Sequence, residues 1–413
     1  MEDIISRIIR RRVRSKIAFL KKHPPKLDYD MLMKQHLHIL KNLQYTSGLF
    51  AASKKDIDTG YDKSWLRDNF YECLAFEVIG DWDTVEKTYE AILKIFLKHE
   101  FKIDHAIENK PKYRYEYIHA RFNPENFDEY WDEWGNKQND SIGAILYRIG
   151  ELEHHHKRYI LKNSDYVRIV NKLVKYLESI KYWCDEDNGV WEENEEVHAS
   201  SVGACVAGLK SIKRLPQIEV PQALIDKGME TLKRLLPRES KTKFVDLALL
   251  SLIYPYDIVT KKQQDKILEN VEYLLLRGRG VIRYKNDHYY NKNPDGYSEE
   301  AEWTFGLSWL AIIYERLGDK EKAKKFIDMA LRDITPNGLP ELYFSNSRKY
   351  NDNNPLGWSE SLFIVALHDI NKKFIEASSI DKKYSKDTIE KRGKVVKDKT
   401  KEKLTGSDEK FEI

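Results

Sequence analysis

Residues 188–209 read NGVWEENEEVHASSVGACVAGL, and the interpretation of the whole chain starts from this stretch. It opens with a turn signal, Asn188-Gly189, and continues with a tryptophan and four glutamates. It ends in small and apolar residues, and a helix that is apolar nearly all round is typically buried. The stretch therefore predicts a loop that carries carboxylates directly into a buried helix.

Two interpretations fit the glutamates that follow Trp191. Like charges crowded beside an aromatic ring disfavour ionisation, so one carboxyl would have a raised pKa and could act as a general acid. Alternatively, they form an acidic first turn that complements the dipole of the next helix. This loop by itself favours the second interpretation. The residues are Glu192, Glu193, Glu195 and Glu196.

Apolar residues recur at helical spacing along most of the chain, and no alternating strand is longer than a few residues. Some of the predicted helices are charged and amphipathic, whereas others are apolar nearly all round. The twelve predicted helices cover 28–45, 68–79, 83–99, 141–155, 164–183, 197–213, 220–236, 244–253, 260–276, 302–317, 319–333 and 358–372.

The buried helices start at regular intervals. Their starting positions are 72, 53, 53, 56 and 56 residues apart, which indicates a repeated helical hairpin. Six hairpins with alternating buried and exposed helices predict an all-α (α/α)6 toroid of two concentric rings. The alternative, an open solenoid, needs distinct capping repeats, which we do not find. The positions are Asp68, Asp140, Glu193, Asp246, Glu302 and Trp358.

Composition excludes several classes of protein. The 413 residues carry a net charge of +3, which gives no field suited to nucleic acid. Three cysteines without metal-ligand spacing fit a reducing compartment. No stretch approaches the roughly 20 apolar residues of an integral membrane segment. The first residues do not read as a secretory signal, so we expect a cytoplasmic protein.

We expect three parts along the chain. Residues 1–26 predict a basic amphipathic helix that either packs on the toroid or contacts a membrane surface or a partner. Residues 27–373 form the toroid. Residues 374–413 lose the apolar pattern and are expected to be a charged, disordered tail, basic enough over 381–403 to contact an acidic partner.

In a toroid, every buried helix starts on the same face, so the preceding loops converge on one funnel. These loops hold tryptophans, arginines and carboxylates, except that the fourth offers only Lys243 and Asp246 as polar candidates. Aromatic faces stack on sugar rings, and charged side chains bind neighbouring hydroxyls. Two carboxylates on opposite walls would complete the machinery of glycoside hydrolysis.

With these loops, the chain resembles glycoside hydrolase family 15, the glucoamylase family, over roughly residues 45–372. Motifs that resemble those of the family occur in family order. They are Trp65-Leu66-Arg67-Asp68, Gln138-Asn139-Asp140, Trp191-Glu192-Glu193, Arg283-Tyr284 and Leu339-Pro340-Glu341, the last followed by Gly357-Trp358-Ser359.

The resemblance implies a role for each motif. Glu192 would be the general acid, Glu341 the general base, and Tyr61 would orient the attacking water. No metal or organic cofactor is implied. The implied substrate-binding residues, besides Tyr61, are Trp65, Arg67, Asp68, Asp140, Trp191, Glu193, Arg283, Tyr284 and Trp358.

These roles predict an inverting, exo-acting glycosidase that releases glucose from the non-reducing ends of α-linked glucans. Room for a water would place the two carboxyl groups about 6.5–9.5 Å apart. The sequence leaves α-1,4, α-1,6 and trehalose linkages open. Only about 45 residues precede the first motif, so we expect the toroid without the β-sandwich domain of many prokaryotic members.

Two other kinds of protein share a toroid of helical hairpins. Regulatory subunits of phosphorylase kinase resemble the family, so a glucan-sensing protein without catalysis is the second hypothesis, and retention of Glu192 and Glu341 argues against it. A terpene-cyclase or prenyltransferase toroid would need an Asp-Asp-x-x-Asp metal cluster, which is absent from the sequence.

Several residues near the funnel keep two interpretations. His198 is either a partner of Glu193 or a satisfied core histidine. Lys243 and Asp246 either form an internal ion pair or bind sugar. Glu360 either faces the funnel or is an acidic residue at a helix N-terminus, where it complements the helix dipole.

The two catalytic carboxyls are expected to differ in pKa. Glu192 lies in the cluster of glutamates, whereas Glu341 has no acidic neighbour in sequence closer than Asp352. We therefore expect the pKa of Glu341 to be raised less than that of Glu192.

Overall fold

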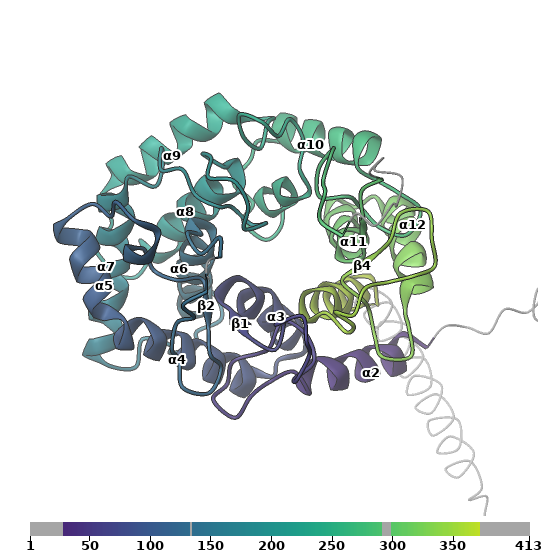
Figure 1. Cartoon of the computed structure of the whole chain (residues 1–413), viewed down its shortest axis with the longest axis horizontal. Coiled ribbons are helices and arrows are strands. Elements are labelled where there is room, and N and C mark those ends of the chain that lie inside the picture. The colour runs from purple at the N-terminus through teal and green to yellow at the C-terminus, as the bar shows by residue number, and fades with distance from the viewer. Residues whose placement is uncertain (1–27, 133, 291–298, 372–413) are drawn as a thin grey trace, which may run out of the picture.

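The computed structural model describes residues 28–132, 134–290 and 299–371, which form two concentric rings of helices (Figure 1). The predicted N-terminal helix and C-terminal tail lie outside these residues. Within the described ranges, no helix is both long enough and apolar enough to cross a membrane.

The outer ring consists of amphipathic helices whose apolar sides face inward. Five of the six begin at a side chain that accepts a hydrogen bond from the first turn: Asp28, Asp81, Asn163, Thr260 and Asp319. These caps fix where each helix starts. The outer helices are α2 (Tyr29–Lys41), α4 (Trp82–Lys98), α7 (Ser164–Ile180), α9 (Gln222–Leu235), α10 (Lys261–Leu274) and α12 (Lys320–Ala330).

The inner ring consists of helices buried on nearly every side. Small residues allow close contact between two of them: a β-carbon on Gly143 would lie 2.4 Å from the carbonyl carbon of Ala204. Larger side chains at this crossing would force the helices apart. The inner elements are α3 (Leu66–Ile79), α6 (Asn139–His154), α8 (Ala199–Ile212), the 3-10 helix η2 (Leu247–Leu252), α11 (Phe305–Leu317) and the helical residues 357–371.

Contacts between the first and last hairpins close the ring. His36 on α2 lies 2.5 Å from Glu360, and Ser361 donates to the carbonyl of Tyr71 on α3. Tyr71 also stacks on Trp358, with ring centroids 4.3 Å apart. The predicted toroid is confirmed, whereas the open solenoid is wrong. Glu360 is fully buried in this seam and does not face the funnel.

The fourth inner element is shorter than predicted. The sequence predicts a helix over 244–253, but η2 is a 3-10 helix of six residues. Asp246 caps its start, and Pro255 cannot continue a helix because it lacks an N–H donor. The fourth wall is therefore formed largely by loops.

One segment between the first two hairpins was not predicted. It contains α5 (Glu100–Glu108) and the 3-10 helix η1 (Arg114–Glu116), and it explains the interval of 72 residues. Its strand β2 (Arg121–Phe122) pairs antiparallel with β1 (Ser64–Trp65). A second two-stranded sheet pairs β3 (Glu302–Trp303) with β4 (Leu342–Tyr343). Each sheet fixes a loop at the mouth of the ring.

Candidate active site

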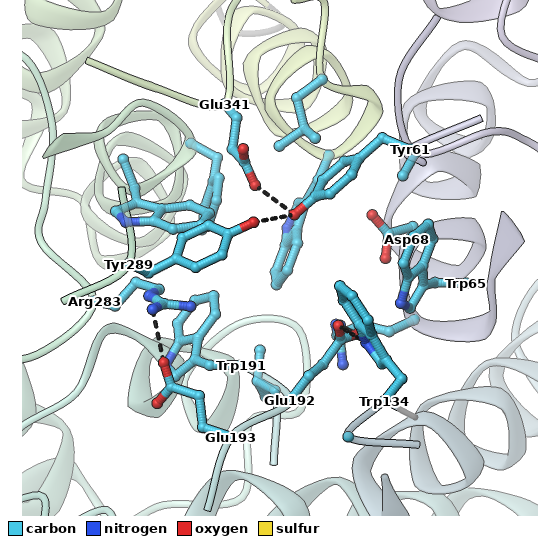
Figure 2. Close-up of a pocket in the computed structure, with 18 residues that line it drawn as sticks. Tyr61, Trp65, Asp68, Trp134, Trp191, Glu192, Glu193, Arg283, Tyr289 and Glu341 are labelled. Carbon is cyan, nitrogen blue, oxygen red and sulfur yellow. Dashed lines mark hydrogen bonds and ion pairs between the residues drawn. The ribbon is translucent and has the colours of Figure 1, made fainter. Parts of the chain in front are cut away.

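The loops that lead into the inner helices surround one cavity of about 350 Å³ (Figure 2). Buried aromatic rings, including Phe70, Tyr71 and Trp309, fill the centre of the ring. Two of the predicted site residues, Asp140 and Tyr284, do not line this cavity. The ten that do are Tyr61, Trp65, Arg67, Asp68, Trp191, Glu192, Glu193, Arg283, Glu341 and Trp358.

Glu192 stands on a tight turn at the edge of the cavity. Its φ of 63° lies in the left-handed region, which is uncommon for a residue with a side chain and is often found at functional sites. Its carboxyl accepts hydrogen bonds from Arg67, at 3.0 Å, and from the indole of Trp134, at 2.5 Å. These two donors, from the first turn of α3 and from the loop before α6, fix the orientation of the carboxyl.

The neighbouring glutamates do not crowd Glu192. Glu195 pairs with Arg114, and Glu196 accepts hydrogen bonds from Ser240 and Thr242. The crowding that the sequence suggests is therefore absent, because the carboxylates diverge. The acidic first turn is wrong, because α8 has no acidic residue there.

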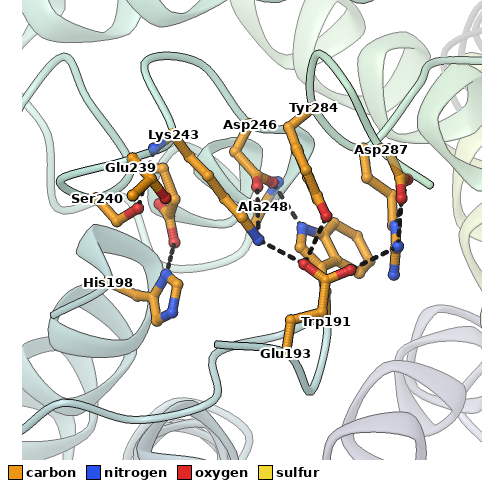
Figure 3. A network of polar contacts seen from close by, with 12 residues as sticks. Trp191, Glu193, His198, Glu239, Ser240, Lys243, Asp246, Ala248, Tyr284 and Asp287 are labelled. Atoms are coloured by element: carbon orange, nitrogen blue, oxygen red, sulfur yellow. Dashed lines mark hydrogen bonds and ion pairs between the residues drawn. The ribbon is translucent and has the colours of Figure 1, made fainter. Parts of the chain in front are cut away.

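Glu193 is held by a polar network on the fourth and fifth loops (Figure 3). It accepts hydrogen bonds from Arg283 at 2.7 Å, from Lys243 at 2.8 Å and from the hydroxyl of Tyr284 at 2.7 Å. These partners lower the pKa of Glu193 although burial works against its charge. The prediction that Tyr284 contacts substrate is corrected, since its hydroxyl points to Glu193 from outside the cavity.

The thin fourth loop positions other side chains. Asp246 accepts a hydrogen bond from the indole of Trp191 at 2.8 Å and so orients a cavity wall. His198 lies 3.4 Å from Glu239 and does not bond to Glu193. Burial disfavours its charge, but Glu239 and the negative charge of Asp187 raise the pKa of His198 to about 9.

Glu341 lies on the opposite side of the cavity from Glu192 (Figure 2). One oxygen accepts a hydrogen bond from Tyr61 at 3.0 Å, and the other accepts bonds from Asn351 at 2.5 Å and Asn353 at 2.8 Å. Burial raises its pKa although all three donors favour the ionised form. The expectation from the sequence counted charged neighbours and not burial, and burial is what raises this pKa.

Arg67 and Asp68 form the wall at the start of α3. Gln138 and Asp140 hold the Arg67 guanidinium from behind, at 2.7 and 3.5 Å. Asp140 therefore contacts Arg67 and does not line the cavity. This corrects the prediction that Asp140 contacts substrate. Asp68 points into the cavity (Figure 2), and burial together with the charge of Glu192 raises its pKa to about 7.

Eight cavity residues were not among the predicted site residues. Trp134 and Trp303 occur in loops that the sequence assigns to the funnel, so their composition could have identified them. Tyr289, whose hydroxyl lies 3.1 Å from that of Tyr61, carried no sequence signal. The eight are Ala52, Trp134, Gly135, Val190, Tyr289, Trp303, Phe305 and Leu356.

The arrangement can hold a sugar ring between aromatic faces, with donors and carboxylates around its edge. Phe305 and Trp358 stack with centroids 4.6 Å apart and form part of the floor. In the described ranges, no group of three or more His, Cys, Asp or Glu side chains could hold a metal ion.

This ring and its cavity have the architecture of an (α/α)6 toroid. The model of the family described as glycosyl hydrolases family 15 matches residues 28–394. The chain belongs to this family.

Curated relatives include both regulatory proteins and hydrolases. The alpha regulatory subunit of phosphorylase b kinase from rat skeletal muscle is 26% identical, over 82% of this chain and 32% of that protein. An uncharacterised glycosyl hydrolase of Methanocaldococcus jannaschii is 22% identical, over 84% of this chain and 57% of that protein. The chain thus matches about a third to somewhat over half of the length of these relatives.

Solved structures share the fold. A wild-type glycosidase superposes with a TM-score of 0.71 at 18% identity, covering 84% of this chain and 99% of that one. A bacterial glucoamylase complexed with acarbose gives a TM-score of 0.64 at 16% identity, covering 83% of this chain and 55% of that one.

Proposed function

We propose that this protein is an inverting, exo-acting glycosidase that releases glucose from the non-reducing ends of α-linked glucans. Glu192 protonates the glycosidic oxygen, and Glu341 removes a proton from the attacking water. Arg67, Asp68 and Arg283 bind the terminal sugar.

The observation that carries the proposal is the pair of carboxyl groups, Glu192 and Glu341, on opposite sides of one cavity (Figure 2). Inverting hydrolysis needs an acid at the leaving oxygen and a base at a water on the other face of the sugar. The hydroxyls of Tyr61 and Tyr289 beside Glu341 supply hydrogen-bonding partners for that water. The aromatic floor favours entry of a chain end over passage of an internal segment.

The test is the stereochemistry of the product. Maltooligosaccharides, isomaltose and trehalose are each incubated with the protein, and NMR records the anomeric form of the first glucose released. β-glucose from an α-linked substrate is the expected result. Release of α-glucose would contradict inversion, and shortening of chains without free glucose would contradict exo action.

A glucan-binding regulatory protein is the second candidate, because the rat relative is named as a regulatory subunit. The same cavity would then bind a chain end without cleaving it. Binding of maltooligosaccharides without glucose release between pH 4 and 8 would favour this candidate, and turnover that Glu341→Gln abolishes would exclude it.

A further inference from the structure

Residues 187–196 form a loop that is closed at its base by backbone hydrogen bonds. Asp187 and Glu196 exchange both N–H···O bonds there, at 2.9 and 3.0 Å. Glu192 and Glu193 lie between these two ends. The position of the Glu192 carboxyl therefore depends on how this loop is held.

The imidazole ring of His198 contacts both arms of the 187–196 loop. The residue is 4% exposed. On one arm, a β-carbon on Gly189 would lie 2.8 Å from the Cδ2 of His198, so the ring needs a residue without a side chain there. On the other arm, the carbonyl oxygen of Asn194 lies 3.5 Å from Nε2. The ring therefore bridges the two arms on either side of Glu192.

Each ring nitrogen of His198 faces an oxygen that accepts hydrogen bonds. Nδ1 lies 3.4 Å from the carboxylate of Glu239, which is 2% exposed (Figure 3). Nε2 faces the carbonyl of Asn194. Only the charged imidazolium carries a proton on both nitrogens, whereas a neutral ring would turn a lone pair toward one of these oxygens. The geometry therefore favours the charged form, in agreement with the raised pKa of His198.

Among the described residues, the groups whose charge acts on His198 are mostly carboxyls. They come from the 187–196 loop, from the fourth loop and from α6, and together they outweigh the cost of burying the charge of the ring. Loss of the proton from His198 would remove a counter-charge from these carboxyls, so the charge and the conformation of the loop stabilise each other. The groups are Asp187, Glu196, Glu239 and Asp140, with the ammonium of Lys243.

We propose that charged His198 is a positioning residue, which holds the 187–196 loop and thereby the carboxyl of Glu192. The inference rests on the proposed function for the role of Glu192 as the general acid. Without the charge, one of the two polar contacts of the ring is lost. The loop can then move away from Trp134, whose indole donates to Glu192.

Two substrates with different leaving groups test this positioning. His198→Gln removes the charge and keeps most of the side-chain volume. Maltose needs a proton from Glu192, whereas fluoride leaves without one, so kcat should fall about tenfold on maltose and less than about threefold on α-glucosyl fluoride. A general loss of stability would lower both rates alike. Equal losses on the two substrates would overturn the proposal.

His36→Gln is the matched control. His36 is also buried, and its Nδ1 also faces a glutamate, Glu360, at 2.5 Å. Its Nε2 has no hydrogen-bond partner among the described residues, and its ring packs on Phe363 at the seam of the toroid. This variant should therefore keep the wild-type ratio of the two rates. A change of the ratio as large as that in His198→Gln would overturn the proposal.

A spectroscopic measurement does not depend on activity. The indole N–H of Trp134, which donates to Glu192, is followed by NMR in protein that contains isotope-labelled tryptophan, and Trp134→Phe assigns its signal. The signal should shift or broaden in His198→Gln and stay in place in His36→Gln. An unmoved signal in His198→Gln would overturn the proposal.

The wild type gives the same test should His198→Gln fail to fold. As the pH rises from about 8 to 10, His198 loses its proton near pH 9, and the Trp134 signal should move with that midpoint. A constant signal over this range would overturn the proposal. If the wild type releases no glucose from any substrate, the proposed function fails, and the Trp134 signal alone decides whether His198 positions the loop.

Discussion

The two carboxyl groups of the cavity occupy contrasting environments. Glu192 lies on a strained turn, keeps 13% of its side chain exposed, and pairs with a cation, Arg67. Glu341 lies next to β4 and is 2% exposed, and its hydrogen-bond donors among the described residues are neutral: two amides and a hydroxyl. The difference shows that their environments, and not their spacing in sequence, separate the two groups chemically.

The contrast supports the roles proposed for the two groups. Neutral donors orient Glu341 without neutralising a charge, and the hydroxyls of Tyr61 and Tyr289 lie where a water would be activated. Glu192 accepts a hydrogen bond from the indole of Trp134, which lines the same cavity.

The largest effect is expected from Glu341→Gln. The amide cannot accept a proton from water, so turnover should fall by about 10²–10⁴-fold on every substrate, whatever its leaving group. Initial rates on maltose and on α-glucosyl fluoride measure this. A loss on maltose alone would show that the base is elsewhere.

Glu192→Gln should lower the turnover of maltose much more than the turnover of α-glucosyl fluoride. Maltose needs a proton on its leaving oxygen, so its turnover should fall by about 10²–10⁴-fold. Fluoride leaves without protonation, so turnover of α-glucosyl fluoride should fall by less than about tenfold. Equal losses on both substrates would contradict the assignment of the acid.

Tyr61→Phe should have a smaller effect with a defined pH dependence. Glu341 must be ionised to act, so activity falls as the pH drops through its raised pKa. Tyr61 donates to the ionised form, and its loss raises this pKa further. The acid limb of the pH–rate profile should therefore move to higher pH, with kcat about tenfold lower. An unmoved limb would show that another group controls it.

Much of the fold could be predicted from the sequence, because the alternation of buried and amphipathic helices is a local pattern. The short η2 could not be predicted, because Pro255 ends the helical pattern early. Helix α5 could not be predicted either, because it lies in the one interval that departs from the repeat. Ring closure through His36 and Glu360 joins residues more than three hundred positions apart, which no local pattern specifies.

The sequence predicts most of the residues that line the cavity, but it predicts their hydrogen-bond partners and neighbours less well. Motifs located ten of the cavity residues, yet only the fold shows that Asp140 and Tyr284 act from behind Arg67 and Glu193. Glutamates that are adjacent in sequence are also not close together in space, because the turn at Glu192 directs neighbouring side chains to different partners.

The smallest effect concerns Asp68, which faces both carboxyls. It is 7% exposed, makes no side-chain hydrogen bond to another described residue, and has its pKa raised to about 7 by burial and by the charges of Glu192 and Glu341. The unfolded chain releases this proton near pH 4 and the native state only near pH 7, so stability falls as the pH rises between these values. Asp68→Asn removes that cost, about 4 kcal/mol at pH 7 for a shift of about three pKa units, and should raise Tm there by about 5 °C but not at pH 4. Calorimetric melting at both pH values tests this, with the exposed Asp58→Asn as control. A lower Tm at pH 7 would mean that the native state needs the Asp68 carboxylate ionised, and the contrast between Glu192 and Glu341 would then extend to a third charge in the cavity.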